Sequence, residues 1–257
     1  MTCHILATCL DRSRYGAVSL LFHTVRKGFP TAKLVVYGNG MADDIAHHTQ
    51  SCCRAVDAEF FNLPNNTAHG RWIEHLVQNE REPFWIADTD LVFFGPVQDW
   101  FRGRENDVLY SGRFEPTFWG GWTQTMHMER LHPSLMWFNP QLLRAAARST
   151  PTGNQFLSTI ELNLYRWQMV PERKADGSRL FKFYDTCSGL WHALDGLPFT
   201  EEMSDQYEHL YNGSYLHLMP GVDGMLKMHD DIFKHPAAAK GLWKSQQKWY
   251  LEHAVKG

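Results

Sequence analysis

The sequence lacks several features that would place it in a class at once. Its 257 residues include no apolar run of about 18, the minimum for a membrane-spanning helix. It has no long basic run and a net charge of −3, which argues against nucleic acid as its main partner. Residues 1–6 have neither the basic start nor the long apolar stretch of a secretory signal, so we expect a cytoplasmic protein.

Cysteine and histidine do not show the spacing of familiar zinc sites. The five cysteines are an odd number without a repeat, and Cys52 and Cys53 are adjacent, which is unfavourable for a Cys-x-x-Cys zinc site. We therefore interpret them as reduced thiols. The fourteen histidines include no His-Glu-x-x-His motif, so most are expected to be ordinary polar or core residues.

Apolar side chains are plentiful. Hydrophobic residues make up 44% of the chain and charged residues 21%, which is typical of a globular protein with a packed core. The sequence has no internal repeat, low-complexity segment or obvious linker. We predict one compact domain over residues 1–257, with a nucleotide-binding half (1–110) and an acceptor-binding half with a C-terminal helix (111–257).

The first part of the chain alternates between predicted strands and helices. The predicted strands are residues 4–10, 33–37 and 58–63, and the predicted helices are residues 17–27, 41–53 and 69–80. This order is typical of parallel β-α-β units with right-handed crossovers. In such α/β sheets ligands bind outside the carboxyl ends of the strands. Asp11, Arg12 and Tyr15 follow the first predicted strand, where they could hold a ribose, a phosphate and a base respectively, or form only a polar surface loop.

Residues 84–95 carry the strongest chemical signal. An apolar run between Pro83 and Gly95 predicts a buried strand, and it is interrupted by Asp88, Thr89 and Asp90. Two ionised carboxylates cannot be buried without solvent, hydrogen bonds or a cation. Carboxylates suit hard divalent ions such as Mg²⁺ and Mn²⁺, and the alternative is a solvated strand end that caps a turn.

This strand ending in Asp-x-Asp, about a third of the way along the chain, resembles the GT-A-type nucleotide-sugar-dependent glycosyltransferases. The resemblance implies a single α/β domain with a mixed, mostly parallel central sheet flanked by helices. It also implies sugar transfer from a nucleoside-diphosphate sugar to a carbohydrate or glycan-precursor acceptor, with Mn²⁺ or Mg²⁺ as cofactor. A membrane-borne acceptor, and so peripheral attachment to a membrane, is left open.

The resemblance also assigns roles to individual residues. Asp90 would bind the metal directly, and Asp88 would bind the metal, the ribose or both, with Thr89 beside the nucleotide sugar. Enzymes of this type often bring a C-terminal histidine back to the metal. His217 is the first choice, because it lies in an apolar predicted strand that precedes a Pro-Gly turn, and His229 is the second.

The second half of the chain is less regular. Predicted strands are residues 107–111, 135–138, 180–184 and 214–218, and predicted helices start at Pro140 and cover 154–167, 187–194 and 236–255. Residues 171–178 are predicted to form a charged turn. Residues 114–122 form an aromatic and glycine-rich loop whose rings could stack on a sugar or pack in the core. We predict Trp119, Trp122 and Trp137 as acceptor-binding residues.

Asp185 follows a predicted strand and precedes a predicted helix, which leaves two interpretations. Its side chain could cap the helix by accepting from free backbone amides. It could also act as a general base on the acceptor hydroxyl, as an inverting transferase requires. Both roles could coexist.

Two other functions compete with the transferase. The stretch from Asp88 to Val92 also fits the opening motif of haloacid-dehalogenase-like phosphatases, although that family carries it on the first strand and three β-α units precede it here. The second alternative is a carbohydrate- or nucleotide-binding protein of the same fold without turnover.

Overall fold

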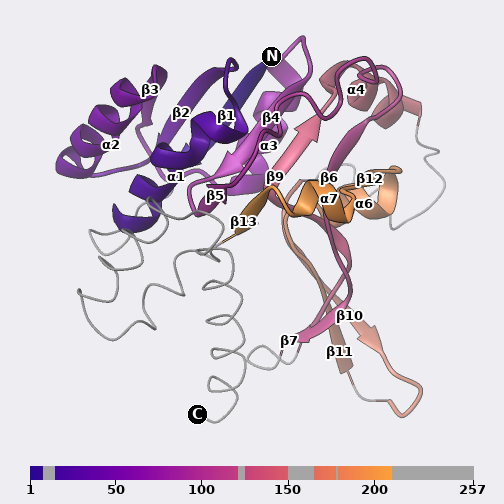
Figure 1. The fold of residues 1–257 in the computed structure, drawn as a ribbon. Helices are drawn as coiled ribbons and strands as arrows, with labels where there is room; N and C mark the ends of the chain where they lie inside the picture. Colours follow the sequence, from indigo (N-terminus) through magenta and orange to yellow (C-terminus); the bar gives the residue numbers. More distant parts are fainter. Residues whose placement is uncertain (8–14, 121–124, 150–164, 178, 210–257) are drawn as a thin grey trace. The chain divides into compact units, whose positions relative to one another are not determined.

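The computed structural model describes residues 1–7, 15–120, 125–149, 165–177 and 179–209 (Figure 1). The strands are β1 (Thr2–Ala7), β2 (Lys33–Asn39), β3 (Ala58–Leu63), β4 (Phe84–Asp88), β5 (Leu91–Phe93), β6 (Tyr110–Glu115), β7 (Phe118–Gly120), β8 (Thr125–His127), β9 (Arg130–Phe138), β10 (Gln168–Arg173), β11 (Arg179–Tyr184), β12 (Leu197–Pro198) and β13 (Tyr207–His209). The helices are α1 (Tyr15–Gly28), α2 (Asp43–Ala55), α3 (His69–Asn79), α4 (Pro140–Ser149), α6 (Ser188–Ala193) and α7 (Glu201–Ser204).

The main sheet has seven strands in the order β12-β6-β9-β4-β1-β2-β3. Strands β2 and β3 are parallel, as are β12 and β6, whereas β9 is antiparallel to both β4 and β6. Two smaller sheets have the orders β10-β11-β8-β7 and β13-β5. The predicted α/β class, with a mixed central sheet and flanking helices, is confirmed.

The described chain forms two compact units built from interleaved stretches. Of the described residues, unit 1 comprises those within Met1–His4, Asn66–Ala87 and Phe101–Thr200, and unit 2 comprises those within Ile5–Asn65, Asp88–Trp100 and from Glu201 to His209. The predicted single domain, with halves 1–110 and 111–257, stays a prediction. Among the described helices, none combines the length and apolar character needed to span a bilayer.

Aromatic residues fill the core of unit 1. Phe101 lies between two tryptophans, with ring centroids 5.7 Å from Trp85 and 4.8 Å from Trp137. Phe84 stacks on Phe138 across the β4–β9 pair at 5.5 Å. All five side chains are fully buried, so the continuous apolar runs of β4 and β9 reflect strands that have no solvent-facing side.

The core of unit 2 packs α1 against β5. Leu21 and Val25 on α1 are fully buried, and Phe29 contacts Phe93 edge-on at 5.4 Å. The hydroxyl of Thr24 accepts a hydrogen bond from the backbone N–H of Phe93 at 3.1 Å. This buried bond fixes β5, whose first residue directly follows the Asp-x-Asp motif.

Several predicted boundaries in the second half were wrong. The strand expected at 107–111 lies at Tyr110–Glu115, and the strand expected at 135–138 starts at Arg130. Its pairing with β6 is interrupted between Gly112 and Arg113, opposite the segment that contains Pro133, and such irregularities are where proline is tolerated in a sheet. The expected charged turn begins as strand β10. Predicted elements at 154–167, 214–218 and 236–255 lie outside the described residues, apart from residues 165–167.

Candidate functional site

The candidate site is built where β4 ends. Phe84, Trp85, Ile86 and Ala87 are buried, and the strand finishes at Asp88, which is half-buried. Thr89 and Asp90 form the turn into β5, and they are only 8% and 5% exposed to solvent. The predicted pair of carboxylates at the end of a buried strand is therefore present.

A histidine from much later in the chain completes the cluster. Strand β13 pairs antiparallel with β5, and the register places His209 opposite Leu91, directly after the motif. The Nε2 atom of His209 lies 3.2 Å from Oδ2 of Asp90, and the two side chains are 8% and 6% exposed. One ligand atom each of Asp88, Asp90 and His209 lies within 4.8 Å of the others.

The strands that carry this cluster are firmly held within unit 2. The backbone N–H groups of Phe94 and Gly95 both donate to the carbonyl of Gln206, at 2.8 and 3.3 Å. The ring of Tyr207 contacts that of Phe93, with centroids 6.4 Å apart. Because β5 is also bonded to α1, the turn with Asp90 and the strand with His209 share one rigid support.

The donor set fits a divalent cation. A bond length of about 2.1 Å lets two ligands of one ion lie up to about 4.2 Å apart, so small side-chain rotations suffice to close this cluster on a metal. Two carboxylates suit Mg²⁺ and Mn²⁺, whereas the imidazole nitrogen favours a transition metal over Mg²⁺. Such a cluster leaves further coordination positions for water or a substrate oxygen.

Sequence reasoning did not single out His209. Strand β13 has only three residues, Tyr207, Glu208 and His209, which is too short to show a period. The sequence analysis expected a returning histidine but attached this role to other residues. His217 and His229 lie outside the described residues, so their assignments stay predictions.

The structure says less about the other residues predicted to bind the donor or the acceptor. Asp11, Arg12 and Trp122 lie outside the described residues. Tyr15 is the first residue of α1, and Trp119 lies in β7. Their predicted roles in nucleotide-sugar and acceptor binding stay predictions.

Trp137 requires a correction. It was predicted to bind the acceptor, but its side chain is fully buried in β9 and contacts the ring of Phe101, with centroids 4.8 Å apart. A fully buried ring offers no face to a sugar. Trp137 is a core residue of unit 1, and burial of a large apolar surface explains its presence.

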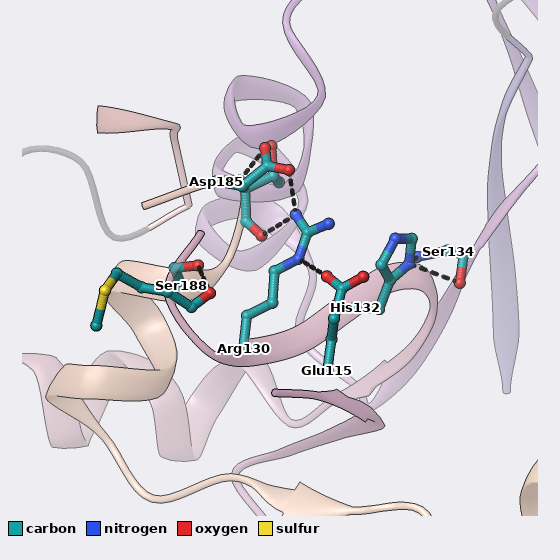
Figure 2. A network of polar contacts seen from close by, with 8 residues as sticks. Glu115, Arg130, His132, Ser134, Asp185 and Ser188 are labelled. Carbon is teal, nitrogen blue, oxygen red and sulfur yellow. Dashed lines mark hydrogen bonds and ion pairs between the residues drawn. The ribbon is translucent and has the colours of Figure 1, made fainter. Parts of the chain in front are cut away.

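Asp185 belongs to a polar network in unit 1 (Figure 2). Its Oδ2 lies 2.7 Å from an Nη1 of Arg130, whose Nε donates to Glu115 at 2.6 Å. Arg130 also donates to the carbonyl of Thr186 at 3.2 Å. Burial alone would lower the pKa of Arg130, but the two carboxylates outweigh it and raise that pKa above its ordinary value.

The helix-cap interpretation of Asp185 was wrong. Cys187 occupies the N-cap of α6, in the left-handed region at φ 69°, and no side chain caps the helix there. Oδ1 of Asp185 accepts instead from the N–H of Thr186 at 2.7 Å. Both carboxylate oxygens of Asp185 therefore have protein partners, one in Arg130 and the other in this amide. Its role as a general base stays a prediction.

Comparisons with known proteins find similar solved structures at low sequence identity. No protein-family profile and no curated protein sequence matches the chain. Its structure is similar to that of the WbbM bifunctional glycosyltransferase, with a TM-score of 0.44, 10% identity and coverage of 77% of this chain and 38% of that one. It is also similar to the glycosyltransferase GlyE of Streptococcus pneumoniae, with a TM-score of 0.44, 10% identity and coverage of 92% and 52%.

A third similar structure was solved with ligands. This is the mannosyltransferase PcManGT of Pyrobaculum calidifontis in complex with GDP-Man and Mn²⁺, with a TM-score of 0.39, 10% identity and coverage of 99% and 81%. The chain spans less than two thirds of the length of the first two proteins.

Proposed function

We propose that this protein is a metal-dependent glycosyltransferase of the GT-A type. It would transfer a sugar from a nucleoside-diphosphate sugar to the hydroxyl group of a carbohydrate or glycan-precursor acceptor. The observation that carries the proposal is the convergence of Asp88, Asp90 and His209 at the end of a buried strand. A solvated strand end needs no buried histidine beside a buried carboxylate, whereas a cation site does.

The chemistry of sugar transfer matches this cluster. Breaking the bond between sugar and diphosphate leaves negative charge on the diphosphate, and a bound divalent cation supplies the compensating positive charge. Asp90 and His209 would hold that cation, because both are buried and fixed by the β5–β13 pair. Asp88 is more exposed, so it can reach the metal, the donor ribose or both.

Mn²⁺ is the proposed cofactor in preference to Mg²⁺. Mg²⁺ demands oxygen ligands in a nearly ideal octahedron, whereas Mn²⁺ accepts a mixed set of two carboxylates and one imidazole. Asp11, Arg12, Tyr15 and Thr89 remain the proposed contacts to the donor, and Trp119 and Trp122 the proposed contacts to the acceptor.

The phosphatase alternative is less well supported. In that family the first aspartate of the motif is the nucleophile and lies on the first strand of the chain. Here the motif begins at the last residue of the fourth strand, β4, and Asp90 forms an ion pair with His209. Metal-dependent hydrolysis of a generic phosphate ester, unaffected by nucleotide, would favour the phosphatase.

Thermal unfolding with a panel of nucleoside diphosphates, each with and without Mn²⁺, tests the proposal. A ligand at about 100 times its Kd adds about 2.7 kcal/mol to the stability, which gives a readily visible shift in Tm. We expect one diphosphate to raise Tm only with Mn²⁺, and the Asp90→Asn variant to lose the effect. Asp99→Asn, an exposed aspartate of the same unit, is the matched control and should retain it.

Two results would remove the proposal. One is a panel in which no nucleotide shifts Tm with or without metal. The other is a shift that Asp90→Asn leaves unchanged. Release of free sugar or nucleoside diphosphate from the stabilising donor then separates an active transferase from a protein that only binds the nucleotide.

A further inference from the structure

The small four-stranded sheet of unit 1 has one face lined by apolar rings. Phe118 pairs with His127, His127 with Phe183, and Phe183 with Met169, so these four residues form a row across β7, β8, β11 and β10. Directly paired residues point to the same side of a sheet. The ring centroids of His127 lie 4.5 Å from Phe118 and 4.9 Å from Phe183.

The same face continues toward the tip of the β10–β11 hairpin. Phe181 pairs with Pro171 two residues further along, and Trp167 contacts Phe183 at 6.0 Å. Exposed fractions on this face reach 61% for Trp167, 47% for Met169, 43% for Phe118 and 36% for Phe181. Leu180 and Tyr184, which point to the other side, are only 8% and 6% exposed. We call this surface, formed by the rings and Met169, the hairpin face.

Two arginines lie next along the hairpin face. Arg173 and Arg179 are directly paired at the end of β10 and β11, and both are exposed. Like charges directly opposite one another destabilise a sheet. Among the ion pairs of the described residues, none includes either arginine. The turn adds one positive and one negative charge, Lys174 and Asp176, so the tip of the hairpin keeps a net positive charge.

We propose that the hairpin face docks on a lipid bilayer that contains anionic lipids. Tryptophan and phenylalanine side chains enter the boundary between headgroups and acyl chains, and arginine binds the phosphates while its stem covers apolar surface. The exposed rings lie beside a directly paired, exposed couple of arginines, which matches an apolar layer beneath negative headgroups. Figure 1 shows β10 and β11 extending away from α6 of the same unit, in the form of a long hairpin.

Charge selects this partner over the two other candidates. A neutral glycan would use the rings but would leave the two arginines facing each other without an anion. A second copy in a two-fold contact would meet the same patch, with the same arginine pair. Of these three partners, only an anionic lipid surface contacts the apolar rings and also neutralises the two arginines.

The test is co-sedimentation of the full chain with vesicles of phosphatidylcholine alone or with added phosphatidylglycerol, without metal or nucleotide. We expect binding to the anionic vesicles and little to the neutral ones. Each basic side chain near such a surface contributes about 1 kcal/mol, a factor of about five. The variant Arg173→Gln/Arg179→Gln should therefore bind about 25-fold more weakly, and Trp167→Ser/Phe181→Ser should also lose most binding.

Matched controls separate docking from loss of fold. Phe61→Ser removes a ring that is 52% exposed on β3, and Arg104→Gln removes an exposed arginine of unit 1. Both should bind vesicles as the parent chain does. Thermal unfolding of every variant checks that it is folded.

Three results would overturn the inference. The first is a parent chain that ignores anionic vesicles. The second is binding that the arginine and ring variants leave unchanged. The third is a concentration-dependent dimer, seen by sedimentation velocity, that Trp167→Ser/Phe181→Ser abolishes while vesicles are not bound. Because the assay contains neither donor nor Mn²⁺, its outcome is independent of the proposed transferase.

Discussion

Nε2 of His209 lies 3.2 Å from Oδ2 of Asp90, although Asp90 lies in the turn before β5 and His209 ends β13, much later in the chain. The contact depends on the register of β13 against β5, because a slip by one residue turns every side chain to the opposite face. The third ligand of the candidate metal centre is therefore a product of strand pairing rather than of a local motif.

Replacement of this histidine should weaken metal binding. Loss of a group that only supports a ligand typically costs 10–100-fold in metal affinity, and we expect His209→Ala to cost at least about ten-fold for Mn²⁺. Titration with Mn²⁺ followed by electron paramagnetic resonance measures the affinity. His217→Ala is the comparison, since the sequence alone favoured that residue. If His217→Ala loses Mn²⁺ and His209→Ala does not, the assignment of His209 is wrong.

The carboxylates could be predicted from sequence and the histidine could not. Asp88 and Asp90 follow an apolar run, and the cost of burying a charge already implies a partner. His209 has no such frame, since its strand is three residues long. It becomes visible only through its pairing with β5.

The fold shows a similar division. In the first part of the chain, helices and strands alternate with clear periods, and β2, β3 and α3 lie within a few residues of their predicted positions. Later, β9 tolerates Pro133 at an irregularity that sequence reasoning treats as a break. Trp137 illustrates a further limit, because the sequence alone does not show whether the ring of an aromatic residue in a predicted strand is exposed or buried.

The buried arginine of unit 1 should be essential to stability. Arg130→Met would leave Glu115 and Asp185, whose side chains are 23% and 32% exposed, without their buried counter-charge. Loss of hydrogen bonds to charged groups costs about 1.5–3 kcal/mol. Urea unfolding at neutral pH measures the loss. Arg130→Met combined with Glu115→Gln and Asp185→Asn should recover part of it, and a loss that persists unchanged would mean that packing of the arginine stem dominates.

Gly28 should tolerate no side chain while Phe93 is present. A Cβ built on Gly28 would lie 2.5 Å from Cδ1 of Phe93, whose ring is fully buried between α1 and β13. Overpacking of this kind costs about 1–3 kcal/mol, and we expect Gly28→Ala to lower the free energy of unfolding by that amount. Because Phe93 is in β5, Mn²⁺ affinity should fall as well. The double variant Gly28→Ala/Phe93→Leu provides the space and should restore part of both; equal losses in the two variants would contradict the packing argument.

Stability should increase as the pH rises toward 6.5, the ordinary pKa of histidine. Burial lowers the pKa of His127 and of His192 below the ordinary value of 6.5, and for His192 the nearby Glu129 opposes the shift only in part. Below pH 6.5 the unfolded chain therefore binds more protons than the folded one, so protonation favours unfolding. The contribution of these histidines is fully present above pH 6.5 and is lost as the pH falls toward their folded-state pKa values. Urea midpoints across this range measure the slope, and His192→Gln should reduce it. A slope of the opposite sign, or one that His192→Gln steepens, would show that the folded state holds these imidazoles as cations.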